Sequence, residues 1–163
     1  MAVDKKMNLF ESEKYPDGNG LSRKSVDIPC DGSRILVADD DASVRVTFRA
    51  VFRHYLPEYS CDIVGNGLEA VRLFSEGHHR IVLTDLHMPV LNGKQAFDRM
   101  MALCSERHWQ EPCVLFCTGY APSPDVYELV ANNPAHALLV KPVENCTLIE
   151  AVRNRLDGKR ASG

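Results

Sequence analysis

Aspartates follow two apolar segments that each have the length of a buried β-strand. Residues 35–38 run directly into three consecutive acids at 39–41, and residues 81–84 run into Asp85. Carboxylates held this close repel one another unless a cation balances their charge. Hard cations such as Mg²⁺ take oxygen ligands. The pattern therefore predicts an oxygen-rich pocket for Mg²⁺ where the two segments end.

The apolar patterning around these acids alternates between two periods. Short apolar runs predict strands at residues 35–38, about 60–64, 81–84, 113–117 and 137–140. Helical spacing predicts a helix after each strand, with apolar faces at 44, 48, 51, 52 and 55 in the first helix and at 148, 149, 152 and 156 in the last. Five such units predict an α/β fold, with one doubly wound, five-stranded parallel sheet in a single domain.

Residues that could carry chemistry stand at the carboxyl ends of four predicted strands. Asp39 and Asp40 follow the first strand, Asp85 the third, Thr118 the fourth and Lys141 the fifth. Ligands of such sheets bind at the carboxyl ends of the strands, so these groups converge on one edge. Phosphoryl transfer needs carboxylates for Mg²⁺, one carboxylate that attacks, and donors for the phosphoryl oxygens. Each residue alone has an ordinary explanation, but the whole set favours this chemistry.

The motifs together resemble the receiver domains of response regulators in two-component signalling. They span residues 34–157 and comprise Ile35-Leu36-Val37-Ala38-Asp39-Asp40-Asp41, Thr84-Asp85-Leu86-His87-Met88-Pro89 with Gly93, Cys117-Thr118-Gly119 and Val140-Lys141-Pro142. The resemblance implies a flavodoxin-like sheet with strand order 2-1-3-4-5. It also implies a chemotaxis-regulator-like protein that catalyses its own phosphorylation and slow dephosphorylation rather than an enzyme acting on other substrates.

The resemblance further implies roles for the acidic residues. Asp85 would be the phosphoacceptor. Direct contact with Mg²⁺ would come from Asp40, Asp85 and the main-chain carbonyl of His87, while Asp39 would act through water. The side chains of His87 and Tyr120 occupy variable positions that flank the site in the family, where they would tune the access of water.

Thr118 and Lys141 would contact the phosphoryl group, and Lys141 would pair with Asp85 in its absence. The family also suggests a cis bond between Lys141 and Pro142. Many members carry an aromatic residue three positions before the lysine, where this chain has Leu138. Whether a switch survives with leucine at this position is left open, whereas a shift of the loop after Thr118 is expected.

Charge and hydropathy indicate the partners and the compartment. The net charge is −3, and residues 34–157 carry 12 basic and 16 acidic residues, which argues against direct binding of nucleic acid. The sequence has no apolar run long enough to span a membrane and no apolar leader, so a cytoplasmic protein is predicted. A histidine kinase or histidine phosphotransfer protein would supply phosphoryl. The downstream protein partner is not encoded in these motifs, and a phosphorylation-dependent homodimer is an open alternative.

Composition also divides the chain. Residues 1–33 are polar and broken by proline and glycine, which predicts a disordered N-terminal tail. Residues 34–157 form the receiver domain and residues 158–163 a C-terminal tail, so no output domain is expected. The six cysteines have no CxxC spacing, which predicts free and mostly buried thiols. His78 and His79, in a loop before a strand, are expected on the surface, and Trp109 is expected to anchor packing.

Two other functions compete with this interpretation. Asp39-Asp40-Asp41-Ala42-Ser43 also resembles the DxDx(S/T) motif of haloacid-dehalogenase-type phosphatases, in which Asp39 would be the nucleophile and Asp41 the general acid. That assignment leaves the Asp85 motif unexplained, and its last acidic motif would have to come from Glu144, Glu150 or Asp157. A module that binds partners independently of phosphate is the third alternative.

Overall fold

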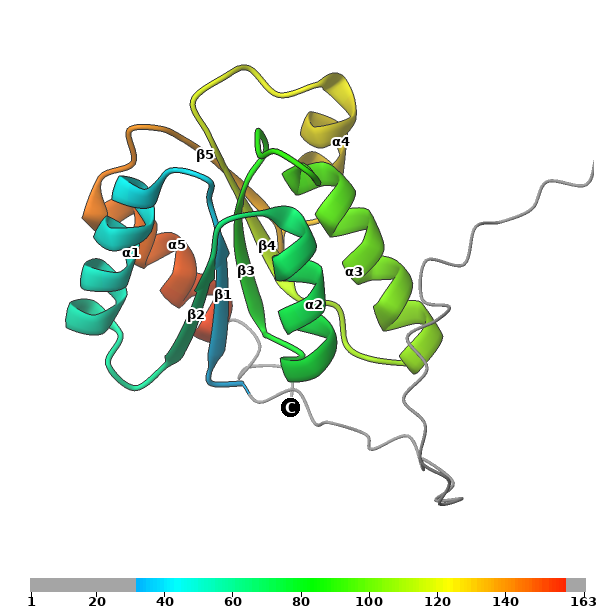
Figure 1. Ribbon diagram of the computed structural model, residues 1–163, viewed down its shortest axis with the longest axis horizontal. Coiled ribbons are helices and arrows are strands. Elements are labelled where there is room, and N and C mark those ends of the chain that lie inside the picture. The colour runs from blue at the N-terminus through cyan, green and yellow to red at the C-terminus, as the bar shows by residue number, and fades with distance from the viewer. Residues whose placement is uncertain (1–31, 158–163) are drawn as a thin grey trace, which may run out of the picture.

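The computed structural model describes residues 32–157, in which five strands alternate with five helices (Figure 1). The strands are β1 (Arg34–Ala38), β2 (Ser60–Val64), β3 (Ile81–Asp85), β4 (Cys113–Thr118) and β5 (Ala137–Val140). The helices are α1 (Ala42–Tyr55), α2 (Gly67–Gly77), α3 (Gly93–Arg107), α4 (Pro124–Asn132) and α5 (Asn145–Asp157). The predicted C-terminal tail, and all but the last two residues of the predicted N-terminal tail, lie outside the described residues.

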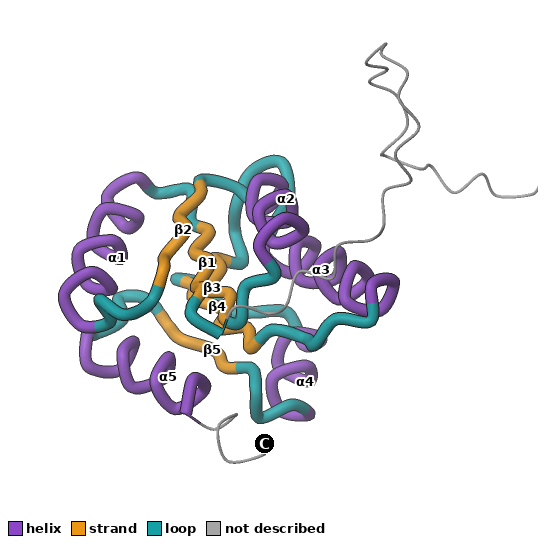
Figure 2. Tube along the Cα trace, turned by 90° about the horizontal axis from the view of Figure 1, so that it is seen from below, coloured by secondary structure: helices purple, strands orange, loops and turns teal. Residues whose placement is uncertain are grey.

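All five strands are parallel and lie in the order β2-β1-β3-β4-β5. The predicted fold class and strand order are thus confirmed. Figure 2 shows α1 and α5 on one face of the sheet and α2, α3 and α4 on the other. The direction of winding switches between β1 and β3. Sheets of this kind bind ligands at the carboxyl ends of the strands beside this switch.

Alternate residues of each strand pack into two apolar cores, one on each face of the sheet. In β1, Ile35 and Val37 belong to the core shared with α1 and α5, whereas Leu36 and Ala38 belong to the core shared with α2, α3 and α4. Every residue of β3 and β4 is buried, because helices cover the centre of a parallel sheet on both faces. This closely packed centre holds the side chains at its carboxyl end in place.

Two helix starts shape the loops that carry the acidic residues. Asp41 caps α1, where its Oδ1 accepts hydrogen bonds from the backbone N–H groups of Ser43 (2.8 Å) and Val44 (3.4 Å). Helix α3 begins at Gly93, where a Cβ atom would overlap the main-chain carbonyl of Asp85. The absence of a side chain at Gly93 therefore lets α3 start directly against the end of β3.

His78 and His79 are buried, so the expectation that they lie on the surface is wrong. His78 ends α2 with a φ of 43°, and its ring stacks on Trp109 with 4.3 Å between the centroids. His79 Nε2 lies 2.7 Å from Oδ2 of Asp62 on β2. These partners are distant in sequence, which is why the local pattern did not reveal the burial. Trp109 packs against the core, as predicted.

The remaining side-chain predictions hold in part. Tyr55, placed on the apolar face of α1 by its spacing, is exposed. The five cysteines within the described residues are free, as expected; Cys61 is half-buried, Cys146 is exposed, and the others, Cys104, Cys113 and Cys117, are buried. Cys30 lies outside the described range. Between residues 32 and 157, no helix has both the length and the apolar character that a membrane span requires.

Candidate functional site

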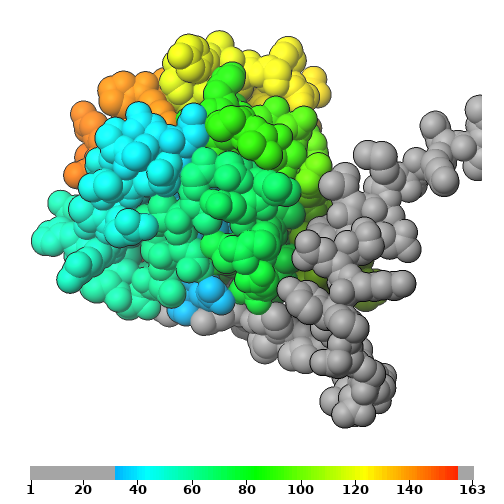
Figure 3. Space-filling model, in the orientation of Figure 1, coloured from blue at the N-terminus to red at the C-terminus, as the bar shows by residue number. Residues whose placement is uncertain are grey.

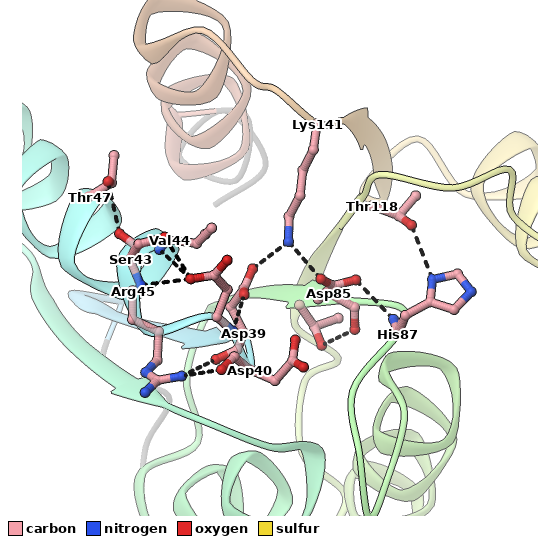
Figure 4. A network of polar contacts seen from close by, with 12 residues as sticks. Asp39, Asp40, Ser43, Val44, Arg45, Thr47, Asp85, His87, Thr118 and Lys141 are labelled. Atoms are coloured by element: carbon pink, nitrogen blue, oxygen red, sulfur yellow. Dashed lines mark hydrogen bonds and ion pairs between the residues drawn. The ribbon is translucent and has the colours of Figure 1, made fainter.

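The carboxyl ends of β1, β3 and β5 bring two carboxylates and an ammonium into contact (Figure 4). Lys141 directly follows β5 and places its Nζ 2.6 Å from Oδ2 of Asp85 and 2.7 Å from Oδ2 of Asp39. The expected pairing of Lys141 with Asp85 is thus present, and Asp39 shares the same ammonium. The peptide bond between Lys141 and Pro142 is cis, as the resemblance implied.

These three charges are largely withdrawn from solvent. The side chains of Asp39, Asp85 and Lys141 are 1%, 10% and 22% exposed. Burial raises the pKa of Asp39, although the hydrogen bond from Lys141 opposes the change. Burial would lower the pKa of Lys141, but the hydrogen bonds and charges of the two carboxylates outweigh it and leave that pKa raised. One protonated ammonium therefore faces two buried acidic groups.

Asp40 adds a third carboxylate at the solvent edge of the site. It is exposed, and one oxygen each of Asp39, Asp40 and Asp85 lie within 4.8 Å of one another. Three carboxylates served by one ammonium form an oxygen-only donor set with excess negative charge, which fits a hard cation such as Mg²⁺. Arg45 holds this loop, because its Nη1 donates to the main-chain carbonyls of Asp39 (2.8 Å) and Asp40 (2.9 Å).

Both carboxylate oxygens of Asp85 have a donor. Oδ2 accepts from Lys141, and Oδ1 accepts from the backbone N–H of His87 at 2.9 Å. These two donors, one on each oxygen, fix the orientation of the Asp85 side chain at the edge where the strands end. The side chain of His87 is exposed and points away from Asp85 toward β4, with Nδ1 3.3 Å from Oγ1 of Thr118 (Figure 4).

Thr118 is fully buried at the end of β4, and its hydroxyl is engaged with the following loop. Oγ1 lies 3.2 Å from the backbone nitrogen of Tyr120 and 3.3 Å from its carbonyl oxygen. A hollow of about 600 Å³ between this loop and the loop after β3 is lined by Asp40, His87, Pro122 and their neighbours. In Figure 3, the segments that follow β1, β3, β4 and β5, coloured cyan, green, yellow and orange, meet at the upper surface of the molecule.

The structure thus gathers Asp39, Asp40, Asp85, Thr118 and Lys141 at one edge, as the strand-end argument predicted. Sequence reasoning missed the contact of His87 with Thr118, for which no local signal exists. It also missed the hydrogen bonds of Arg45 to the main chain of the acidic loop. An arginine one turn into the helix that follows an acidic loop could have predicted them.

The structure disfavours the phosphatase alternative. Asp41 would have to act as a general acid, yet its side chain caps α1 and accepts a hydrogen bond from Ser43 Oγ at 2.6 Å. That hydrogen bond is the main reason that the pKa of Asp41 is lowered, which suits a cap rather than a proton donor. The candidates for the last acidic motif are all exposed and stand outside the described acidic cluster: Glu144, Glu150 and Asp157.

Comparison with known proteins extends this picture. Residues 35–153 match the family model of the response regulator receiver domain. The chain is 26% identical over 121 residues to the chemotaxis protein CheY of Thermotoga maritima, and the match covers 74% of this chain and 95% of that protein. It is 27% identical over 124 residues to the peroxide stress-activated histidine kinase mak3 of Schizosaccharomyces pombe, with 74% of this chain matched but 5% of the kinase.

A solved receiver domain has the same fold. It belongs to a sensor histidine kinase of Pseudomonas aeruginosa and holds a magnesium ion in its active-site cleft; the TM-score is 0.61 at 21% identity, over 77% of this chain and 98% of that one. Against five of the related full-length proteins, the chain spans between 5% and 23% of their length. The family match, the strand order and the acidic edge agree, and the chain belongs to the response regulator receiver family of two-component signalling.

Proposed function

We propose that Asp85 accepts a phosphoryl group from a phosphohistidine, in a step that depends on Mg²⁺ and that the chain itself catalyses. The observation that carries this assignment is the contact of Lys141 with Asp85, beside the acidic cluster at the carboxyl edge. Asp85 ends a fully buried strand, and Leu86 and His87, which follow it, line the open hollow at the carboxyl edge, so a donor can approach from outside.

The transfer is a displacement at phosphorus. A carboxylate oxygen of Asp85 attacks the phosphorus atom, and the bond between phosphorus and the donor imidazole breaks with its electron pair left on the imidazole nitrogen. The product is an acyl phosphate on Asp85. Lys141 donates to the phosphoryl oxygens. Slow hydrolysis follows when water attacks the phosphorus, which regenerates the carboxylate and releases inorganic phosphate.

Mg²⁺, when bound, supplies positive charge against the negative charge that develops on the phosphoryl oxygens. Asp40, Asp85 and the main-chain carbonyl of His87 would hold it, with Asp39 acting through water. The donor set supports this assignment, because a single ammonium serves the buried carboxylates. The magnesium ion in the cleft of the Pseudomonas aeruginosa receiver supports it as well.

Phosphorylation would draw the Thr118 hydroxyl toward the phosphoryl group and move the loop that leads into α4. Leu138, half-buried against the core, offers no aromatic ring to rotate, so the loop is the moving part. The partners would be a cytoplasmic histidine kinase or phosphotransfer protein upstream and a protein contact at α4, β5 and α5 downstream. The excess of acidic residues in 34–157 supports output through protein rather than nucleic acid. A phosphorylation-dependent homodimer is one form that such a contact could take.

A labelling experiment tests the acceptor. The protein is incubated with Mg²⁺ and acetyl phosphate, and the modified residue is mapped by mass spectrometry. Wild type is expected to gain a base-labile phosphoryl group on Asp85, and Asp85→Asn is expected to gain none. Asp41→Asn is the matched control, because Asp41 directly follows Asp40 in the chain but its side chain caps α1. A phosphoryl group mapped to Asp39 would instead support the phosphatase alternative.

A further inference from the structure

The hydrogen bonds around the Thr118 hydroxyl can be assigned by counting donors. A hydroxyl has one hydrogen to donate and two lone pairs that accept. Oγ1 of Thr118 has three neighbours: the Tyr120 N–H, the Tyr120 carbonyl oxygen and His87 Nδ1. The Tyr120 N–H is always a donor and the Tyr120 carbonyl always an acceptor. The hydroxyl therefore accepts from the Tyr120 N–H, and its single hydrogen goes either to the Tyr120 carbonyl or to His87 Nδ1.

One lone pair then remains for His87. If Nδ1 carries a hydrogen, it donates to Thr118 and all three contacts are satisfied. If Nδ1 is bare, the single hydroxyl hydrogen cannot serve both it and the Tyr120 carbonyl, and two acceptors would face each other at about 3.3 Å. The geometry therefore favours the form in which His87 Nδ1–H donates to Thr118.

In this arrangement the Thr118 hydroxyl has no free hydrogen for a phosphoryl oxygen. Its hydrogen is committed to the Tyr120 carbonyl and both lone pairs are occupied. To donate to a phosphoryl oxygen on Asp85, the hydroxyl has to withdraw its hydrogen from the Tyr120 carbonyl, and a movement of Oγ1 toward Asp85 breaks its contact with His87 Nδ1. Figure 4 shows the hydroxyl turned toward His87 and away from Lys141 and Asp85.

We propose that the His87 side chain is a positioning residue that holds the Thr118 hydroxyl in its unphosphorylated orientation and so opposes the phosphorylated one. This inference rests on the proposed function of Asp85, and it concerns a different atom of His87 from the main-chain carbonyl assigned to Mg²⁺. The ring of Tyr120 supports the imidazole, with 5.1 Å between ring centroids and 67° between their planes. Both rings are exposed, so the contact can open without disturbing the core.

Matched substitutions at position 87 separate this role from shielding by the ring. His87→Phe keeps an aromatic ring beside Tyr120 but removes the donor. His87→Asn removes the ring but can place its amide nitrogen where Nδ1 lies. The probe is beryllofluoride with Mg²⁺, a tetrahedral phosphoryl mimic that binds a carboxylate, and the affinity is measured by calorimetry. Losing one opposing hydrogen bond predicts affinity about fivefold tighter for His87→Phe, and affinity within about twofold of wild type for His87→Asn.

A second measurement needs no ligand. The Tyr120 amide donates to Thr118 Oγ1, so its hydrogen exchange in the free protein is expected to accelerate in His87→Phe and to stay near wild type in His87→Asn. Urea unfolding verifies that each variant is folded.

The outcomes separate the two proposals. Weaker or unchanged beryllofluoride binding by His87→Phe, with wild-type binding intact, would overturn the role of His87 and leave the role of Asp85 standing. Equal effects of phenylalanine and asparagine would show that the effect does not follow the hydrogen-bond donor and would also overturn it. Failure of wild type to bind beryllofluoride, while Asp85→Asn behaves identically, would refute the proposed function and this inference together.

Discussion

Replacing Lys141 with methionine removes the ammonium but keeps much of the bulk of the side chain. Asp39 and Asp85 lose a donor at 2.7 Å and 2.6 Å while their side chains stay 1% and 10% exposed. Removing one partner of a buried ion pair costs about 3–5 kcal/mol. Lys141 itself is 22% exposed, and the screening that this allows places the expected loss at the lower end, about 3 kcal/mol.

Urea unfolding at pH 7 in metal-free buffer measures this loss directly. Adding Mg²⁺ is expected to recover part of it, because a cation again balances the acidic cluster. The loss is also expected to shrink as the pH falls from 7 to 5. Burial already raises the pKa of Asp39, and without Lys141 it rises further. An acid with a raised folded-state pKa stabilises the fold below its unfolded pKa, and that stability disappears as the pH rises through the folded value.

The double variant Lys141→Met/Asp39→Asn is the control, because it removes one of the two unpaired carboxylates with the ammonium. It is expected to be more stable than Lys141→Met alone at pH 7. A loss below about 1 kcal/mol for Lys141→Met in metal-free buffer, a value usual for an exposed pair, would refute the charge balance inferred here. So would a loss that does not depend on pH.

Three further outcomes are expected. Asp40→Asn should abolish the rise in Tm that Mg²⁺ gives to wild type without lowering stability in metal-free buffer; an undiminished response in thermal unfolding would exclude Asp40 as a ligand. Gly93→Ala should destabilise by about 2–3 kcal/mol and slow phosphorylation, because its Cβ overlaps the Asp85 carbonyl and overpacking costs this much. Gly119→Ala, with no atom within 4 Å of its Cβ, is the matched control and should change urea stability little. Burial lowers the pKa of His79 despite its hydrogen bond to Asp62, so wild-type stability should fall as the pH drops below about 6.5. His79→Gln should flatten that part of the curve of unfolding free energy against pH. An unchanged slope in this variant would show that His79 is not the group responsible.

Much of the fold follows from short-range pattern. Strand and helix periods are set by neighbouring residues, and the predicted strands agree with β1 to β5 to within a residue at each end. The strand-end rule then placed Asp39, Asp85, Thr118 and Lys141 on one edge. Burial of His78 and His79 could not be predicted from short-range pattern, because it depends on contacts with Trp109 and with Asp62 of β2, which are distant in sequence.

The sequence by itself determined which chemical groups reach the carboxyl edge, because parallel strands of similar length carry their end residues to the same place. Only the tertiary structure decided which partner each of those groups contacts. It made Asp41 a helix cap, although it is adjacent to Asp40, and it gave one ammonium to Asp39 and Asp85 together. It also turned the Thr118 hydroxyl toward His87. These outcomes depend on ångström-scale distances between segments that are far apart in the chain, and such distances arise only from packing of the whole domain.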